Sequence, residues 1–65
     1  MIAVVRLDDA SYGAGPGTVL ALCSSVQDAR VRNADRDGCV PSDLRFWKAS
    51  VETRIGDRVC AMELV

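Results

Sequence analysis

The sequence FWKASVETRIGDRVCAMELV, residues 46–65, is the stretch from which the fold is most directly predicted. Gly56 and Asp57 divide it into two runs of alternating side chains, a pattern typical of a two-residue hairpin turn with glycine first. Such a turn sets Ile55 opposite Arg58, and opposed residues share a face. One face of the predicted hairpin is therefore apolar, with Trp47, Ala49, Val51, Thr53, Ile55, Cys60, Met62 and Leu64.

The other face of this hairpin is mixed. It carries Lys48, Ser50, Glu52 and Arg54 across from Val65, Glu63, Ala61 and Val59. A slip of one residue would mix the two faces, so the pattern favours a single register. We predict strands over residues 44–53 and 58–65.

The first half of the chain predicts two more strands. Residues 1–8 are apolar on both faces near their start, which is typical of a central strand. Three glycines and a proline within residues 10–17 predict a loop. Residues 18–23 are predicted as a strand, although one long helix over residues 16–35 is an alternative that the proline at its start would permit.

A short helix is predicted over residues 25–35. Ser24 and Gln27 have the spacing of a capping box, which places the helix start near Ser25. Asp28 in the first turn suits the helix dipole, as do arginines near the end. The sequence thus predicts one α+β domain over residues 1–65, a four-stranded antiparallel sheet in the order β-β-α-β-β.

The helix is expected to pack on one face of this sheet. Val26 and Ala29 would lie against the apolar face of the hairpin and against the first strand's Ala3, Val5 and Leu7. The opposite face of the sheet would be half exposed and mixed, and such a face, with open strand edges, is suited to a partner.

Length and composition argue against catalysis. A chain of 65 residues has little room for an enclosed pocket. It contains no histidine, which excludes Ser-His-Asp and Cys-His pairs. The aspartates have structural explanations in loops and caps, and no catalytic constellation stands out. We predict that the protein is not an enzyme and needs no cofactor.

No metal site is predicted either. The three cysteines are widely spaced and lack a Cys-x-x-Cys pair. We expect buried or half-buried thiols in a reducing cytosol, with a Cys23–Cys60 bridge or an intermolecular bond through Cys39 as alternatives. Residues 33–38 match the first half of a calcium loop, but Leu44 stands where the bidentate glutamate belongs.

The charge balance is nearly neutral, at −1 with a pI near 5.1, so no basic field draws the protein to nucleic acid. No apolar run is long enough for a membrane span, and no basic region precedes the apolar residues at the start, as it would in a signal peptide. The richness in Arg, Ala, Val, Gly and Asp is typical of GC-rich bacterial or phage genes. We expect the protein to be located in the cytoplasm of a bacterial host cell.

In layout the chain resembles small phage-encoded anti-CRISPR proteins and other host-takeover inhibitors. The resemblance is architectural: a first strand over 1–8, a strand over 18–23 leading into the Ser-capped helix SSVQDAR of residues 24–30, and a closing hairpin. It implies an inhibitor that binds a larger protein or nucleoprotein complex, such as a CRISPR effector subunit, with carboxylates placed where DNA phosphates would lie. The candidate residues are Asp28, Asp35, Asp37, Asp43, Glu52, Asp57 and Glu63.

Two other functions stay open. The first is a nucleic-acid-binding module that stacks bases on Trp47 or Phe46. Its cationic residues would be Arg30, Arg32, Arg36, Arg45, Lys48 and Arg54. The acids interleaved among them weaken this reading. The second is a dimeric accessory protein that associates through an exposed strand edge.

Overall fold

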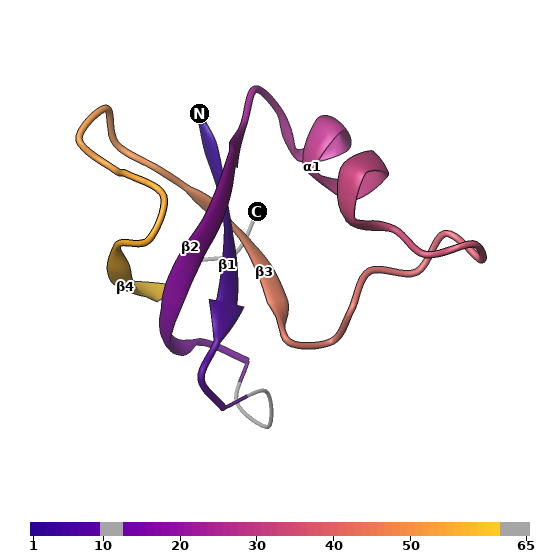
Figure 1. The fold of residues 1–65 in the computed structure, drawn as a ribbon, viewed down its shortest axis with the longest axis horizontal. Coiled ribbons are helices and arrows are strands. Elements are labelled where there is room, and N and C mark those ends of the chain that lie inside the picture. The colour runs from indigo at the N-terminus through magenta and orange to yellow at the C-terminus, as the bar shows by residue number, and fades with distance from the viewer. Residues whose placement is uncertain (10–12, 62–65) are drawn as a thin grey trace.

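The fold, in a computed structural model, is α+β, with one helix against a four-stranded antiparallel sheet among residues 1–9 and 13–61, which the structure describes (Figure 1). The predicted fold class is confirmed. The elements are β1 Ile2–Leu7, β2 Gly15–Cys23, α1 Val26–Asn33, β3 Leu44–Lys48 and β4 Arg58–Ala61.

Strand β1 is central, as predicted. The strand order is β3-β1-β2-β4, so β1 pairs with both β2 and β3. Ala3 of β1, for example, lies opposite Leu22 on one side and Trp47 on the other. β1 is a nearly continuous run of apolar residues because its side chains are buried on both faces of the sheet.

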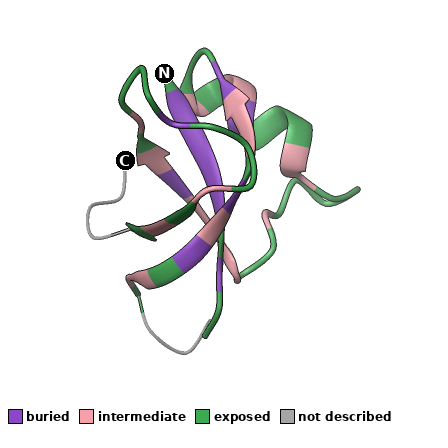
Figure 2. Ribbon diagram, turned by 60° about the vertical axis from the view of Figure 1, so that its left-hand side comes forward, coloured by how far each residue is buried: buried purple, intermediate pink, exposed green. Residues whose placement is uncertain are grey.

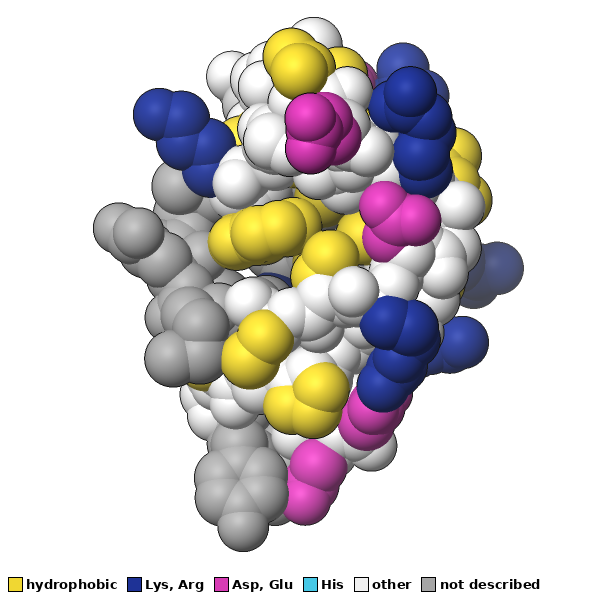
Figure 3. Space-filling view, turned by 90° about the vertical axis from the view of Figure 1, so that its left-hand side faces the viewer, with side chains coloured by type: hydrophobic (Ala, Val, Ile, Leu, Met, Phe, Trp, Pro, Cys, Tyr) yellow, Lys and Arg dark blue, Asp and Glu magenta, His cyan; other side chains and the backbone are white. Residues whose placement is uncertain are grey.

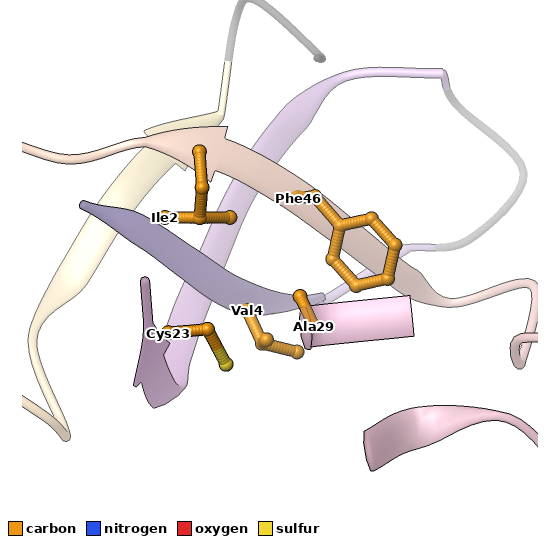
Figure 4. Packing of buried hydrophobic residues seen from close by; sticks show 5 residues of the cluster. All are labelled: Ile2, Val4, Cys23, Ala29 and Phe46. Atoms are coloured by element: carbon orange, nitrogen blue, oxygen red, sulfur yellow. The ribbon is translucent and has the colours of Figure 1, made fainter. Parts of the chain in front are cut away.

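The core is divided by β1 into two clusters. On the helix side, Ile2 and Val4 pack with residues from β2, β3 and α1 (Figure 4). On the other side, Ala3, Val5 and Leu7 pack with Val19 of β2. Figure 2 shows buried positions concentrated in the strands and exposed positions along the helix and the connections.

The predicted hairpin is wrong. β3 and β4 lie at opposite edges of the sheet, and β4 pairs with β2 instead, with Val59 opposite Gly17. The local pattern of residues 46–65 suited a hairpin, but β1 has two apolar faces and two edges to pair. In the observed sheet β3 pairs with the free edge of β1, and β4 pairs with the outer edge of β2. Residues 62–65 of the predicted hairpin lie outside the described residues.

The turn of that prediction is displaced by one residue. Asp57 N–H donates to Arg54 O over 3.1 Å, so the central residues are Ile55 and Gly56. Gly56 has φ 93°, the left-handed conformation that the third residue of a type II turn requires. The glycine therefore serves a turn within the connection between β3 and β4, not between paired strands.

The N-cap of the helix lies one residue later than predicted. Ser25, not Ser24, is the N-cap, and its hydroxyl accepts a hydrogen bond from Asp28 N–H over 3.1 Å. The strand that precedes the cap confirms residues 18–23 as extended, so the long-helix alternative is wrong.

The helix packs on the opposite face of β1 from the predicted one. Ala29 joins the cluster of Ile2 and Val4, while Ala3, Val5 and Leu7 face away from the helix. The prediction assumed that the hairpin and the helix would share one core. With β4 moved to the far edge, the connection between β3 and β4 and the side chain of Val59 cover the second face instead.

β2 begins inside the predicted loop, at Gly15. Gly17 permits this because a Cβ there would lie 2.5 Å from Arg6 O and 2.7 Å from Val5 Cγ1. Only glycine lets the two backbones approach this closely. Further along, the pairing shifts between Val4 and Val5, leaving Leu20 as the extra residue of a β-bulge.

Candidate protein-binding surface

Residues 49–57, here called the crossing segment, join the two edges of the sheet and are anchored at both ends. At the start, Ala49 N–H donates to Met1 O over 3.0 Å. At the end, Gly56 N–H donates to Val19 O over 2.8 Å, and Val19 N–H donates to Asp57 O over 2.9 Å. The last two bonds are reciprocal and tie the segment to β2.

The segment is also held internally. Thr53 is buried, its N–H donates to Ser50 O over 3.2 Å, and the two hydroxyls lie 3.4 Å apart. Arg54 N–H donates to Asp57 Oδ2 over 2.9 Å, which caps the turn. Arg54 Nη1 donates to Val51 O over 3.2 Å. A connection with this many backbone partners holds one conformation.

Two large aliphatic side chains point out from this ordered segment. Val51 is 87% exposed and Ile55 is 67% exposed. Leu20, next to the Val19 anchor, is 38% exposed. Figure 3 shows several separate hydrophobic side chains on this side of the molecule, with basic and acidic side chains most frequent along its right-hand edge. Fixed apolar groups inside a polar rim are typical of protein-binding surfaces.

A salt bridge joins the end of β1 to the start of β4. Arg58 Nη1 donates to Asp8 Oδ1 and to Thr18 Oγ1, each over 2.8 Å, and Arg58 Nη2 donates to Asp8 Oδ2. These hydrogen bonds, with the nearby positive charge, hold the pKa of Asp8 below its usual range. The same contacts raise the pKa of Arg58. Both groups are solvent-exposed, so the pair orients the strands more than it stabilises them.

The predicted acidic residues are not brought together in one patch. Those on α1 and in the loop after it lie on one side of the molecule, and those of the crossing segment lie on the other (Figure 1). The first group is Asp28, Asp35 and Asp37, the second is Glu52 and Asp57, and Asp43 precedes β3. Glu63 lies outside the described residues.

Several of these carboxylates have structural partners. Asp28 Oδ1 accepts from Arg32 Nε over 2.9 Å, and this hydrogen bond raises the pKa of Arg32. Asp35 Oδ1 accepts from the backbone N–H groups of Asp37 and Cys39, over 2.8 and 3.0 Å, and so closes the loop after the helix. Asp57 caps the turn described above.

The arginines of the nucleic-acid alternative are brought together only in part, because Arg30 and Arg45 line one pocket and Arg54 lies away from it. Arg30 and Arg32 lie on α1, while Arg54 lies on the crossing segment at the other side of the sheet. Arg45 donates to the backbone oxygens of Gly13, Ser42 and Leu44. Of the two aromatics, Phe46 is buried and Trp47 half-buried. Their positions do not form a stacking platform beside a continuous basic groove.

The cysteines form no disulfide. Cys23 is buried, as expected, whereas Cys39 and Cys60 are exposed. Within the described residues, no group of three or more histidine, cysteine or acidic side chains could hold a metal ion. The described part of the chain also has no helix long and apolar enough to cross a membrane.

Sequence reasoning assigned Val51 and Ile55 to the core, so it missed the surface that they form. The only signal for it was that residues 49–57 combine β-branched apolar residues with Ser50, Thr53, Gly56 and Asp57, which are frequent in turns. No protein-family model matches this sequence, and the comparisons with curated proteins and with solved structures found no match.

Proposed function

We propose that this protein is a small protein-binding inhibitor or regulator that covers a site on a larger protein or nucleoprotein complex. The observation that carries the proposal is the exposure of Val51 and Ile55 on a segment anchored by backbone hydrogen bonds. These side chains leave water only when a partner covers them. Because the segment is already ordered, a partner would not have to supply the entropy of fixing it.

The free energy gained by burying these two side chains is large enough to contribute to recognition. Burying a valine or isoleucine side chain contributes roughly 1.5–3 kcal/mol. Two such groups would therefore supply the apolar part of an interface. Exposed Glu52 and Arg54 alternate with them along the segment and would form part of the polar rim.

The target class that we propose is a subunit of a CRISPR effector, following the architectural resemblance to anti-CRISPR proteins, acting in a bacterial host cell. The separation of the acidic residues favours contact with protein over mimicry of a DNA phosphate row. In this form of the proposal, Glu52 and Asp57 border the apolar contact, and the acids near α1 lie outside it.

The test compares wild type with a Val51→Asp/Ile55→Asp double variant and with Val31→Asp. Val31 is 71% exposed on α1 and serves as a matched control. Each protein is used as bait for purified CRISPR effector complexes, and each is expressed in a CRISPR-immune host challenged with phage. We expect wild type and the Val31 variant to bind and to protect the phage. The double variant should bind at least about 30-fold more weakly.

The two parts of the proposal fail separately. If wild type binds none of the effector complexes and gives the phage no protection, the CRISPR target is wrong. If the double variant binds a partner as tightly as wild type does, the crossing segment is not the contact surface.

A further inference from the structure

A second candidate site lies on the other side of the molecule, between α1, the loop before β3 and β3 itself. It is a half-open pocket of about 290 Å³. About ten water molecules occupy that volume in the liquid, at roughly 30 Å³ each. Its lining residues are Arg30, Val40, Pro41, Ser42, Leu44, Arg45 and Phe46.

The lining combines an apolar floor with positive charge. Val40 and Leu44 are half-buried and Phe46 is buried, whereas the lining residues include no aspartate or glutamate. The aromatic ring of Phe46 belongs to the helix-side core cluster and lies beside the helix near Ala29 (Figure 4). A ligand body placed here would meet carbon atoms, and its charge would meet the guanidinium of Arg30.

Arg30 is the residue that would recognise the charge. Its guanidinium carbon lies 5.7 Å from the centroid of the Phe46 ring, so the ring positions it at the pocket. Within the described residues Arg30 forms no salt bridge, unlike its helix neighbour Arg32, which is paired with Asp28. A planar guanidinium matches a carboxylate with two parallel hydrogen bonds.

Arg45 lines the pocket from the other wall. Its Nη1 donates to Ser42 O over 2.6 Å and to Leu44 O over 2.8 Å, which fixes the guanidinium beside the pocket.

We propose that this pocket binds a carboxylate attached to a small apolar group, with the carboxylate on Arg30 and the apolar group against Val40, Leu44 and Phe46. The chemistry is shared by a free aryl or branched-chain acid and by the C-terminus of a peptide. The proposal is independent of the crossing segment, which lies on the opposite side of the sheet.

The experiment is an NMR titration of the ¹⁵N-labelled full chain with phenylacetate and, separately, with phenylacetamide, which has the same body without the charge. We expect saturable amide shifts centred on residues 40–46 for the acid, with a dissociation constant on the order of 1 mM. Phenylacetamide should bind at least about tenfold more weakly than phenylacetate. A Gly-Gly-Phe peptide then separates the two sources: tighter binding of the peptide than of phenylacetate indicates a chain terminus, and the reverse order indicates a free acid.

Two variants complete the test. Arg30→Met keeps the aliphatic stem over Phe46 and removes the charge, so it should weaken phenylacetate binding about tenfold or more. Arg36→Met removes an exposed charge that does not line the pocket and should leave binding unchanged. The proposal would be overturned by any of three results. These are equal binding of phenylacetate and phenylacetamide, equal losses of affinity in Arg30→Met and Arg36→Met, and the lack of a saturable shift in residues 40–46.

Discussion

Replacing Phe46 with alanine is expected to leave most of the protein unfolded at 25 °C. Phe46 is 7% exposed and packs with Ile2, Val4 and Ala29 in the helix-side cluster. Truncating a buried phenylalanine costs about 3–5 kcal/mol. A domain of this size has a free energy of unfolding of only a few kcal/mol. The loss therefore matches the whole stability of the fold.

Urea unfolding followed by far-UV circular dichroism measures this effect. Val31→Ala is the control because Val31 is 71% exposed, and we expect it to change the free energy of unfolding by less than about 0.5 kcal/mol. The free energy of unfolding of Phe46→Leu should lie between those of Phe46→Ala and Val31→Ala. If the free energy of unfolding of Phe46→Ala lies within about 1 kcal/mol of the wild-type value, the helix-side cluster is not the core that the structure indicates.

Substituting Gly17 with alanine is the second large effect that we expect. The new Cβ would lie 2.5 Å from Arg6 O and 2.7 Å from Val5 Cγ1. The nearer atom belongs to the backbone of the central strand, so relief requires β1 and β2 to separate. We expect the free energy of unfolding to fall by about 1–3 kcal/mol, as for other overpacked interiors.

The matched control for this substitution is Gly13→Ala. A Cβ on Gly13 meets no atom within 4 Å. Reduced freedom of the unfolded chain should make this change neutral or stabilising by up to about 1 kcal/mol. Thermal unfolding of the two variants side by side gives the comparison. Equal melting temperatures would mean that β1 and β2 are not in close contact at Gly17.

Local pattern was enough to predict several elements of this fold. The two apolar faces of residues 2–5 indicated a central strand, and the spacing of Ser24 and Gln27 indicated the start of α1 near Ser25. In both cases the signal lies within a few residues, where periodicity and capping act.

The pairing of β4 was not predictable in this way. Residues 46–65 fit a hairpin locally, and a long-range competition for the edges of β1 decided otherwise. The candidate surface was missed for the same reason. Val51 and Ile55 are core residues in a hairpin and surface residues in a crossing connection, and their identity alone does not distinguish the two. The acidic residues were chosen by charge, which carries no information on distance.

The pairing of β4 with β2 is the central claim, because the exposure of the crossing segment depends on it. Nuclear Overhauser effects between backbone protons measure this pairing directly. We predict cross-strand effects between Gly17 and Val59 and between Thr18 and Arg58. Effects between Thr53 and Cys60, with none between Gly17 and Val59, would show the hairpin instead. Val51 and Ile55 would then belong to the core, and the proposed binding surface would not exist.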